Sequence, residues 1–177
     1  MKAGSEPKAT TRRVRHPERV ILFYVSNQTF AIAAEAVQEI RSTDSLAGSA
    51  IEIEKSELAK VRHALERGHH TYYVVNACLH FQLPVTRPAL VLILRQLRVA
   101  VLVDRIDRMA ELSAVYALPE AFAGEERGWY RGLAYLDDTV IPVINPAGFV
   151  SREDLASLDR SRGAGIAPSE LERAVPS

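Results

Sequence analysis

The chain has 177 residues, of which 47% are hydrophobic and 25% are charged, as in a folded globular protein rather than a disordered one. Lys and Arg together number 22, as do Asp and Glu, so the formal net charge is zero. No global field would draw such a chain onto nucleic acid or an anionic membrane, and we expect its partners to be proteins or small molecules.

Cysteine content and hydropathy point to a cytoplasmic protein. The single cysteine, Cys78, excludes an intramolecular disulfide, which suits a reducing compartment. The polar, basic beginning of the chain lacks the apolar stretch of a signal peptide. The longest clean apolar run covers only residues 89–94, whereas a membrane-spanning helix needs about 20 residues. We therefore expect no membrane insertion.

The beginning of the chain predicts a basic arm followed by a hairpin. Residues 1–19 contain six Lys or Arg and two acids, which predicts a flexible arm, either a solvated tail without a partner or one in weak electrostatic contact with an acidic partner or a membrane surface. Residues 20–25 are almost entirely apolar and β-favouring, and predict a buried strand. A turn at 26–28 and a second strand at 29–33 complete the hairpin. A short amphipathic stretch follows at 34–40.

The next part predicts one strand and one helix. After a loop at 42–50, residues 51–54 alternate Ile with Glu, as in a half-buried strand. Residues 55–66 predict a helix, with Ser56 as its N-cap and Gly68 as its stop. This helix would place three apolar side chains on one face, namely Leu58, Val61 and Leu65.

The second half predicts paired strands. The expected strands cover residues 71–75, 89–94, 99–103, 112–118, 129–136 and 139–144. The last two are joined by a turn at Asp137 and Asp138. Hairpins of this kind indicate antiparallel barrels, which close on themselves and so remove exposed edges. Residues 151–177 predict a short helix near 152–158 and then a loose tail.

The sequence lacks the motifs of common catalytic centres. No G-x-S-x-G, G-K-[ST] or G-x-G-x-x-G occurs, so nothing points to acyl transfer or to nucleotide phosphates. Asp104 ends a buried strand, so we expect it to make a structural hydrogen bond or ion pair, with general acid–base chemistry as the alternative. Trp129 and Tyr130 either anchor an exposed interface or pack in the core of the last hairpin. We expect no enzymatic activity and no cofactor.

One cluster of side chains could ligate a metal. It consists of His63, His69, His70, Cys78 and His80. Cys78 and His80 on a strand would share one face, which zinc could use, but adjacent histidines on a strand point to opposite faces. In the competing interpretation, the histidines are surface residues and Cys78 is a small buried filler. A metal-binding β-barrel therefore stands as a third functional hypothesis.

Four segments together resemble the CheW-like domain family. They are residues 37–41 (VQEIR), 74–76 with 81–84 (VVN and FQLP), 98–106 (RVAVLVDRI), and 130–134 with 140–145 (YRGLA and VIPVIN). The resemblance runs in the family's order from about residue 20 to residue 150. It implies a mostly β fold of two small, packed antiparallel β-barrel lobes with one or two short helices. Residues 1–19 and 151–177 would flank this domain.

The resemblance also implies a function and a set of contact residues. Members of the family couple methyl-accepting chemoreceptors to the regulatory domain of the CheA-type histidine kinase, without catalysis. Carried over to this sequence, the protein-binding residues are Val37, Glu39, Ile40, Arg67, Gly68 and Gly132. We expect exposed Val37 and Ile40 to supply apolar contact, and Arg67 to donate to a partner's carboxylate or carbonyl.

The middle of the chain departs from the family pattern. Residues 65–70 read LERGHH where the family has an Asn-Leu-Arg-Gly turn, and a predicted helix precedes them. Asn76 and Asn145 stand where Asp is common, and Ala100 where Gly is usual. These departures favour a second hypothesis, in which a divergent module binds only the receptor, or only another CheW-like domain, and modulates array signalling.

Overall fold

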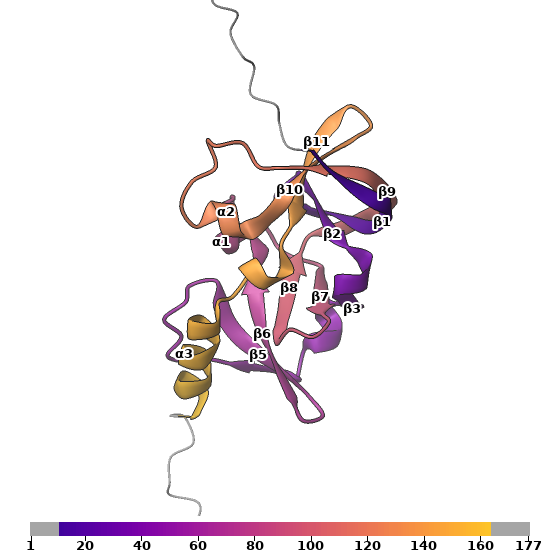
Figure 1. The fold of residues 1–177 in the computed structure, drawn as a ribbon. Helices are drawn as coiled ribbons and strands as arrows, with labels where there is room; N and C mark the ends of the chain where they lie inside the picture. Colours follow the sequence, from indigo (N-terminus) through magenta and orange to yellow (C-terminus); the bar gives the residue numbers. More distant parts are fainter. Residues whose placement is uncertain (1–10, 164–177) are drawn as a thin grey trace, which may run out of the picture.

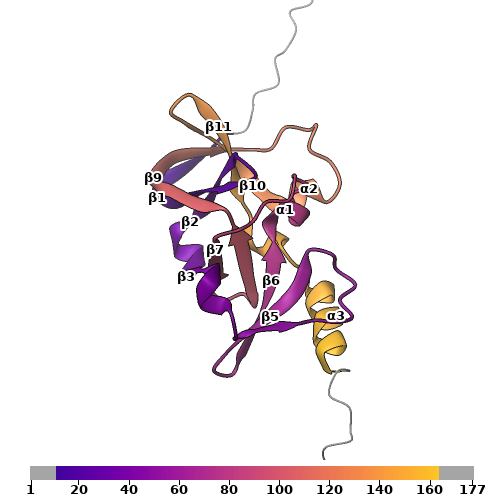
Figure 2. The ribbon, with the colours of Figure 1, turned by 180° about the vertical axis from the view of Figure 1, so that it is seen from behind.

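The structure is a computed structural model that describes residues 11–163, with side chains from residue 17 onward. Two β lobes are stacked on each other, and the ends of the described chain lie in different lobes (Figure 1). The view from behind shows the same two layers, with a helix beside the lower lobe (Figure 2).

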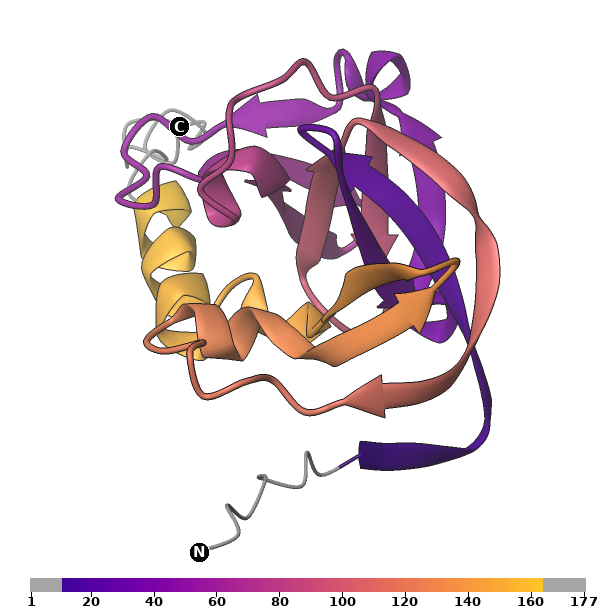
Figure 3. The same ribbon diagram turned by 90° about the horizontal axis from the view of Figure 1, so that it is seen from above.

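The first lobe, called the barrel lobe below, is a closed barrel built from both ends of the chain. Its strands are β1 (Thr11–Val25), β2 (Gln28–Ala33), β9 (Arg105–Tyr116), β10 (Tyr130–Leu136) and β11 (Thr139–Ile144). Their order around the barrel is β1-β2-β11-β10-β9. All neighbours are antiparallel except β11 and β2, which pair in parallel. Seen from above, β1 and β9 run side by side along one wall (Figure 3).

The second lobe, called the sheet lobe, is a six-stranded sheet built from the middle of the chain. Its strands are β3 (Val37–Ser42), β4 (Ala50–Glu52), β5 (Val61–Arg67), β6 (His70–Asn76), β7 (Leu90–Leu94) and β8 (Val99–Val103). The strand order is β3-β7-β8-β6-β5-β4, and only β6 and β8 pair in parallel. The parallel pair needs a long connection, which runs through α1 and β7.

The helices are short and lie between or beside the lobes. They are α1 (Ala77–His80), α2 (Glu126–Trp129) and α3 (Arg152–Gly163), with 3-10 turns at Ala34–Ala36, Thr43–Leu46 and Pro146–Gly148. Asp159 fastens α3 to the sheet lobe, since its carboxylate accepts two bonds from Arg98, at 2.6 and 2.8 Å, and one from the Tyr73 hydroxyl at 2.5 Å. The Arg98 guanidinium is the main reason that the pKa of Asp159 falls to about 2.

The largest apolar core lies between the lobes. Along β1, Val20 and Leu22 point into the barrel, whereas Ile21, Phe23 and Val25 belong to the core shared with the sheet lobe. A strand buried on both faces reads as a continuous apolar run, as residues 20–25 do. The shared core therefore joins the two lobes into one packed unit.

The predicted strands and hairpins are confirmed, but the predicted helix at 55–66 is wrong. Residues 61–67 form β5, which pairs with β4 and β6. Ser56 caps no helix, and its hydroxyl donates instead to the Leu58 carbonyl. A register shift between Val61 and His63 interrupts the alternation of buried and exposed residues, so β5 shows no clear period of two.

The boundaries at the chain ends also differ from those expected. β1 begins at Thr11, where it pairs with Tyr116 of β9, so the second half of the expected arm is a strand. The predicted helical stub extends to Gly163. The rest of the expected arm, residues 1–10, and the expected tail, residues 164–177, lie outside the described residues.

Candidate protein-binding surface

The candidate surface is centred on an ion pair between β3 and the end of β5. Glu39 of β3 accepts a hydrogen bond from the Arg67 guanidinium, and its other carboxylate oxygen lies 3.3 Å from Nε of Arg41. Glu39 and Arg67 are 28 positions apart in the sequence. Each of the three side chains is about one-third exposed, 34% to 35%. The pair is thus formed within the protein and still open to a partner.

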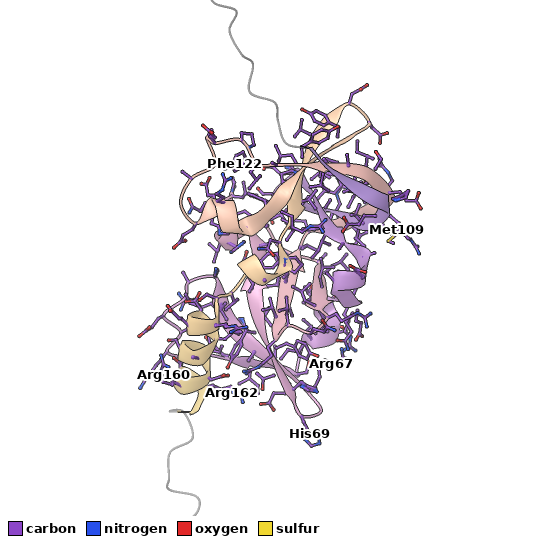
Figure 4. All side chains as sticks on the ribbon, in the orientation of Figure 1. Arg67, His69, Met109, Phe122, Arg160 and Arg162 are labelled. Atoms are coloured by element: carbon purple, nitrogen blue, oxygen red, sulfur yellow. The ribbon has the colours of Figure 1, made fainter. Side chains whose placement is uncertain are left out.

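The β5–β6 turn holds Arg67 in place. Arg67 pairs with His70, which leaves Gly68 and His69 as a two-residue hairpin loop. Gly68 has φ +59°, the left-handed value that the first loop position of a type II′ turn requires and glycine adopts without strain. Figure 4 shows Arg67 and His69 at this end of the sheet lobe, far from Met109 on β9. The predicted role of Gly68 as a helix stop is therefore replaced by a role in a hairpin.

A hollow of about 470 Å³ lies beside the ion pair. Its walls include Gln38 and Arg41 of β3, Arg67 and Gly68 of the hairpin, and Tyr72 of β6. Most of these groups are hydrogen-bond donors or guanidinium cations. The hollow thus suits carboxylates or carbonyls of a protein partner rather than an apolar ligand.

Ile40 is exposed on the opposite face of β3. Successive side chains of a strand point to opposite faces, so Ile40 and Glu39 face different sides of the sheet. Ile40 pairs with Leu92, which belongs to the core between the lobes, and Ile40 itself remains 40% exposed. It therefore offers an apolar contact at the margin of the junction between the two lobes.

Two of the expected contact residues are not at this surface. Val37 is only 8% exposed and packs in the core between the lobes, so the expectation that it is an exposed contact is wrong. Gly132 lies on β10 of the barrel lobe, where its α-carbon packs against the backbone of Tyr116. The structure brings together Glu39, Arg67 and Gly68, and leaves Gly132 with a packing role in the other lobe.

The sequence analysis missed the residues that complete the hollow. Gln38 and Arg41 lie inside the motif at 37–41 but were not assigned a role. His70 and Tyr72 were missed because they become neighbours of Arg67 only when 61–67 is a strand that pairs with β6. Had residues 61–67 been assigned as a strand, their pairing with β6 would have placed His70 and Tyr72 beside Arg67.

The side chains of the metal-binding hypothesis are not brought together among the described residues. Among residues 17–163, whose side chains are described, no group of three or more His, Cys, Asp or Glu is placed to hold a metal ion. Cys78 and His80 lie on the helix α1 and not on a strand. Cys78 is buried with Sγ 3.2 Å from the Thr86 hydroxyl. His69 forms part of the exposed β5–β6 hairpin loop instead.

Asp104 has the structural role that its position predicts. Its carboxylate accepts from the backbone N–H of Ser26 at 2.7 Å and from the Thr86 hydroxyl at 2.5 Å. It thereby ties the β1–β2 turn to the end of β8 and to the segment that leads into β7. Of the two interpretations of Trp129, the structure supports the core position, because this side chain is only 8% exposed.

His80 fills the junction between the lobes. It is 3% exposed, and the rings of Phe81, Trp129 and Phe149 surround it with centroids at 4.8, 4.8 and 4.9 Å. Burial, helped by the nearby ammonium of Lys60, lowers the pKa of His80 from its ordinary 6.5 to about 3. The imidazole is therefore neutral in the folded protein at physiological pH.

We expect the stability of the protein to fall as the pH drops from 6.5 towards 3. Below pH 6.5 the unfolded chain binds a proton at His80 that the folded chain does not bind. The slope from this one group approaches about 1.4 kcal/mol per pH unit. Urea unfolding between pH 7 and pH 4 measures it, with His80→Phe as the variant that lacks the titrating group. An equal slope in the variant, above the pH at which carboxylates titrate, would contradict the assignment.

Among the helices within residues 11–163, none is both long and apolar enough to span a membrane.

Comparison with known proteins shows the family of the chain and solved structures of similar fold. Residues 19–154 match the CheW-like domain family. The fold is similar to that of the scaffolding protein TtCheW from Thermoanaerobacter tengcongensis, with a TM-score of 0.63 and 13% sequence identity. The match covers 80% of this chain and 93% of that one. No curated protein sequence matched the chain.

Proposed function

Because the chain belongs to the CheW-like domain family, we propose that it is an adaptor that couples a methyl-accepting chemoreceptor to a CheA-type histidine kinase. In this proposal the chain catalyses nothing, requires no cofactor and works in the cytoplasm at receptor arrays. The observation that supports this proposal is the solvent-exposed Glu39–Arg67 ion pair, which lies beside the hollow on a CheW-like fold.

The physical argument rests on groups that are ordered but not buried. Glu39 restrains the Arg67 guanidinium, which lowers the entropy that a partner must remove on binding. Ile40, on the other face of the same strand, adds an apolar side chain that is removed from water only when a partner covers it. A receptor segment that covers the β3 edge would meet both features.

The proposal is tested by two separate titrations of the purified chain. One uses the receptor's signalling tip and the other the kinase's regulatory domain, both from the same cell. Binding to each at micromolar strength or better is the expected result. Binding to the receptor alone would favour the divergent module that modulates the array. Binding to neither would refute the coupling role.

Arg67→Glu should weaken receptor binding at least about tenfold while changing the unfolding free energy by less than about 1 kcal/mol. The pair is one-third exposed, so its loss costs little stability, whereas the reversed charge repels a partner carboxylate. The matched control is Arg108→Glu, which breaks an exposed arginine's pairs with Asp107 and Asp137 in the barrel lobe.

The charge-swapped double variant separates contact from internal support. Glu39→Arg with Arg67→Glu can form the ion pair again in the opposite direction. If the receptor reads the guanidinium of Arg67, binding stays weak in the double variant. Restored binding would mean that the pair acts only by holding the β3 edge in place.

A further inference from the structure

One row of side chains on the sheet lobe is covered by α3 at one end and open at the other. The register places Tyr73 of β6 opposite Ala64 of β5, and Ala64 opposite Ile51 of β4, so the three side chains share a face. Tyr73 and Ala64 are fully buried, whereas Ile51, the last in the row, is 44% exposed. The helix α3 lies beside β5 in both views (Figures 1 and 2), and its Leu158 packs in the same core cluster as Tyr73 and Ala64. The cover that α3 provides therefore ends before β4.

A hollow of about 650 Å³ lies between the end of α3 and β4. Ile51 and Ile53 line it from the sheet, and Ser161, Arg162 and Gly163 line it from the helix. Ile53 is only 5% exposed, so Ile51 is the apolar side chain that the described residues leave in contact with water. Covering Ile51 would complete the row and remove apolar surface from water.

The charges around the hollow select against an acidic occupant. Arg162 pairs with Glu66 at 2.6 Å, so these two charges balance each other. The other charged groups at this end of the hollow, namely Glu52, Glu54 and Lys55, are exposed and carry one net negative charge. An uncharged segment with a bulky apolar side chain meets no repulsion there and can cover the open isoleucine.

The sequence that follows α3 has this character. Gly163 is the last described residue and lines the hollow, so the chain continues from its wall. Residues 164–168 read AGIAP and carry no charge, and Ile166 is the first bulky apolar residue after the helix. Three residues span about 10 Å, which is on the order of the width of a hollow of this volume. Ile166 is therefore within reach of Ile51.

The same five residues favour a change of direction after the helix. Gly165 can adopt the left-handed conformations with which chains turn away at helix ends. Pro168 disfavours the helical conformation at Ala167 and favours an extended one. A chain that turns and then extends can pass back over the hollow, whereas a continued helix would lead away from it.

We propose that residues 164–168, called the strap below, dock in the hollow between α3 and β4 with the Ile166 side chain packed on Ile51. The strap completes the cover of the row that begins at Tyr73. Its driving force is the removal of two isoleucine side chains from water, and the contact needs neither a receptor nor a kinase.

The strap would also act on the candidate protein-binding surface. Glu66 lines both this hollow and the hollow beside the Glu39–Arg67 pair, so the two share a wall. Arg162 of α3 holds Glu66 through its ion pair. A docked strap fixes the end of α3, and thereby keeps the shared wall in place.

The experiment is methyl NMR on the full chain with labelled isoleucine δ1 groups, in which a nuclear Overhauser cross-peak appears only when two methyl groups lie close together. We expect a cross-peak between Ile51 and Ile166, with Ile51→Val and Ile166→Val used to assign the two resonances. Ile166→Asp should shift the Ile51 resonance. The same variant should leave the resonance of Ile40 in place, since that side chain is similarly exposed, at 40%, but lies on β3.

Val175→Asp is the matched control, because it places the same carboxylate beyond the strap. It should preserve both the cross-peak and the Ile51 resonance. A full chain without the cross-peak overturns the proposal, and so does an equal shift of Ile51 in both aspartate variants, since the hollow would then not select the strap. An Ile51 resonance that moves with protein concentration, and still does so in Ile166→Asp, assigns the hollow to a second copy of the chain and also overturns it.

Discussion

Replacing Gly132 with alanine will destabilise the protein by about 3 kcal/mol, a large part of a typical unfolding free energy. A Cβ at this position would lie 2.7 Å from Cγ1 of Val115 and closer still to the carbonyl oxygen of Tyr116. The oxygen belongs to the backbone of β9, so it cannot turn away as a side chain could. Relief of the clash requires β10 to separate from β9 where their ladder pairs Leu133 with Tyr116. Chemical denaturation measures the effect.

Gly128→Ala is the matched control for this change. Nothing lies within 4 Å of a Cβ built on Gly128, and its residue is part of α2. Alanine should therefore be neutral there, or stabilise by about 0.5 kcal/mol through lower chain entropy in the unfolded state. If Gly132→Ala behaves like Gly128→Ala, β10 is not packed against β9 as described. The result also distinguishes a packing role of Gly132 from the contact role expected from the sequence.

Ile40→Asp should lower receptor affinity at least about tenfold, which corresponds to 1.4 kcal/mol, and leave the fold intact. The side chain is 40% exposed, so the carboxylate stays in water in the free protein and loses that water only when a partner covers it. Isothermal titration with the receptor tip gives the affinity. Thermal unfolding shows whether the variant keeps its stability.

Val140→Asp serves as the matched control for Ile40→Asp. Val140 is 47% exposed on β11 of the barrel lobe, so the same carboxylate enters a strand of similar exposure far from β3. Both variants should lose no more than about 1 kcal/mol of stability. Unfolding of Ile40→Asp alone would show that Ile40 is a core residue. Equal loss of receptor binding in both variants would remove the β3 edge from the proposed interface.

Strands with a clear apolar pattern were predictable from the sequence. Residues 20–25, 90–94 and 99–103 are mostly buried, β-rich runs, and each lies in a strand that its composition predicts. The turns were also predictable, because Asn and Asp tolerate positive φ, and Asn27, Asp137 and Asp138 adopt it in the structure. Local chemistry determines these elements, so local reasoning finds them.

The failures share one physical cause, the β-bulge. β5 has a register shift between Val61 and His63, and β3 has one between Val37 and Glu39. A bulge inserts a residue and breaks the period of two. As a result β5 resembled a helix. In β3 the bulge turns Val37 and Ile40 to the same face, opposite Leu94 and Leu92, and the core buries Val37 but leaves Ile40 40% exposed. Pairing across strands places bulges, and no local window contains that information.

Only part of the candidate surface was predictable from the sequence, and its geometry was not. Glu39, Arg67 and Gly68 were assigned to one surface by resemblance, and the structure places them together. The ion pair itself depends on curling of the sheet, which brings β3 near the β5–β6 hairpin although they stand far apart in strand order. A sequence separation of 28 residues gives no sign of this contact.

The strand order has a consequence for the course of folding. The sheet lobe uses one continuous stretch of chain, from Val37 to Val103, whereas the barrel lobe needs β1 and β2 together with β9, β10 and β11. During synthesis the sheet lobe can therefore fold first, while the large apolar face of the β1–β2 hairpin remains exposed to solvent. The barrel cannot close until Ile144 has left the ribosome. The intermediate that exposes most apolar surface thus has a folded sheet lobe and a β1–β2 hairpin that is not yet packed into the barrel. We expect chaperones to bind that hairpin.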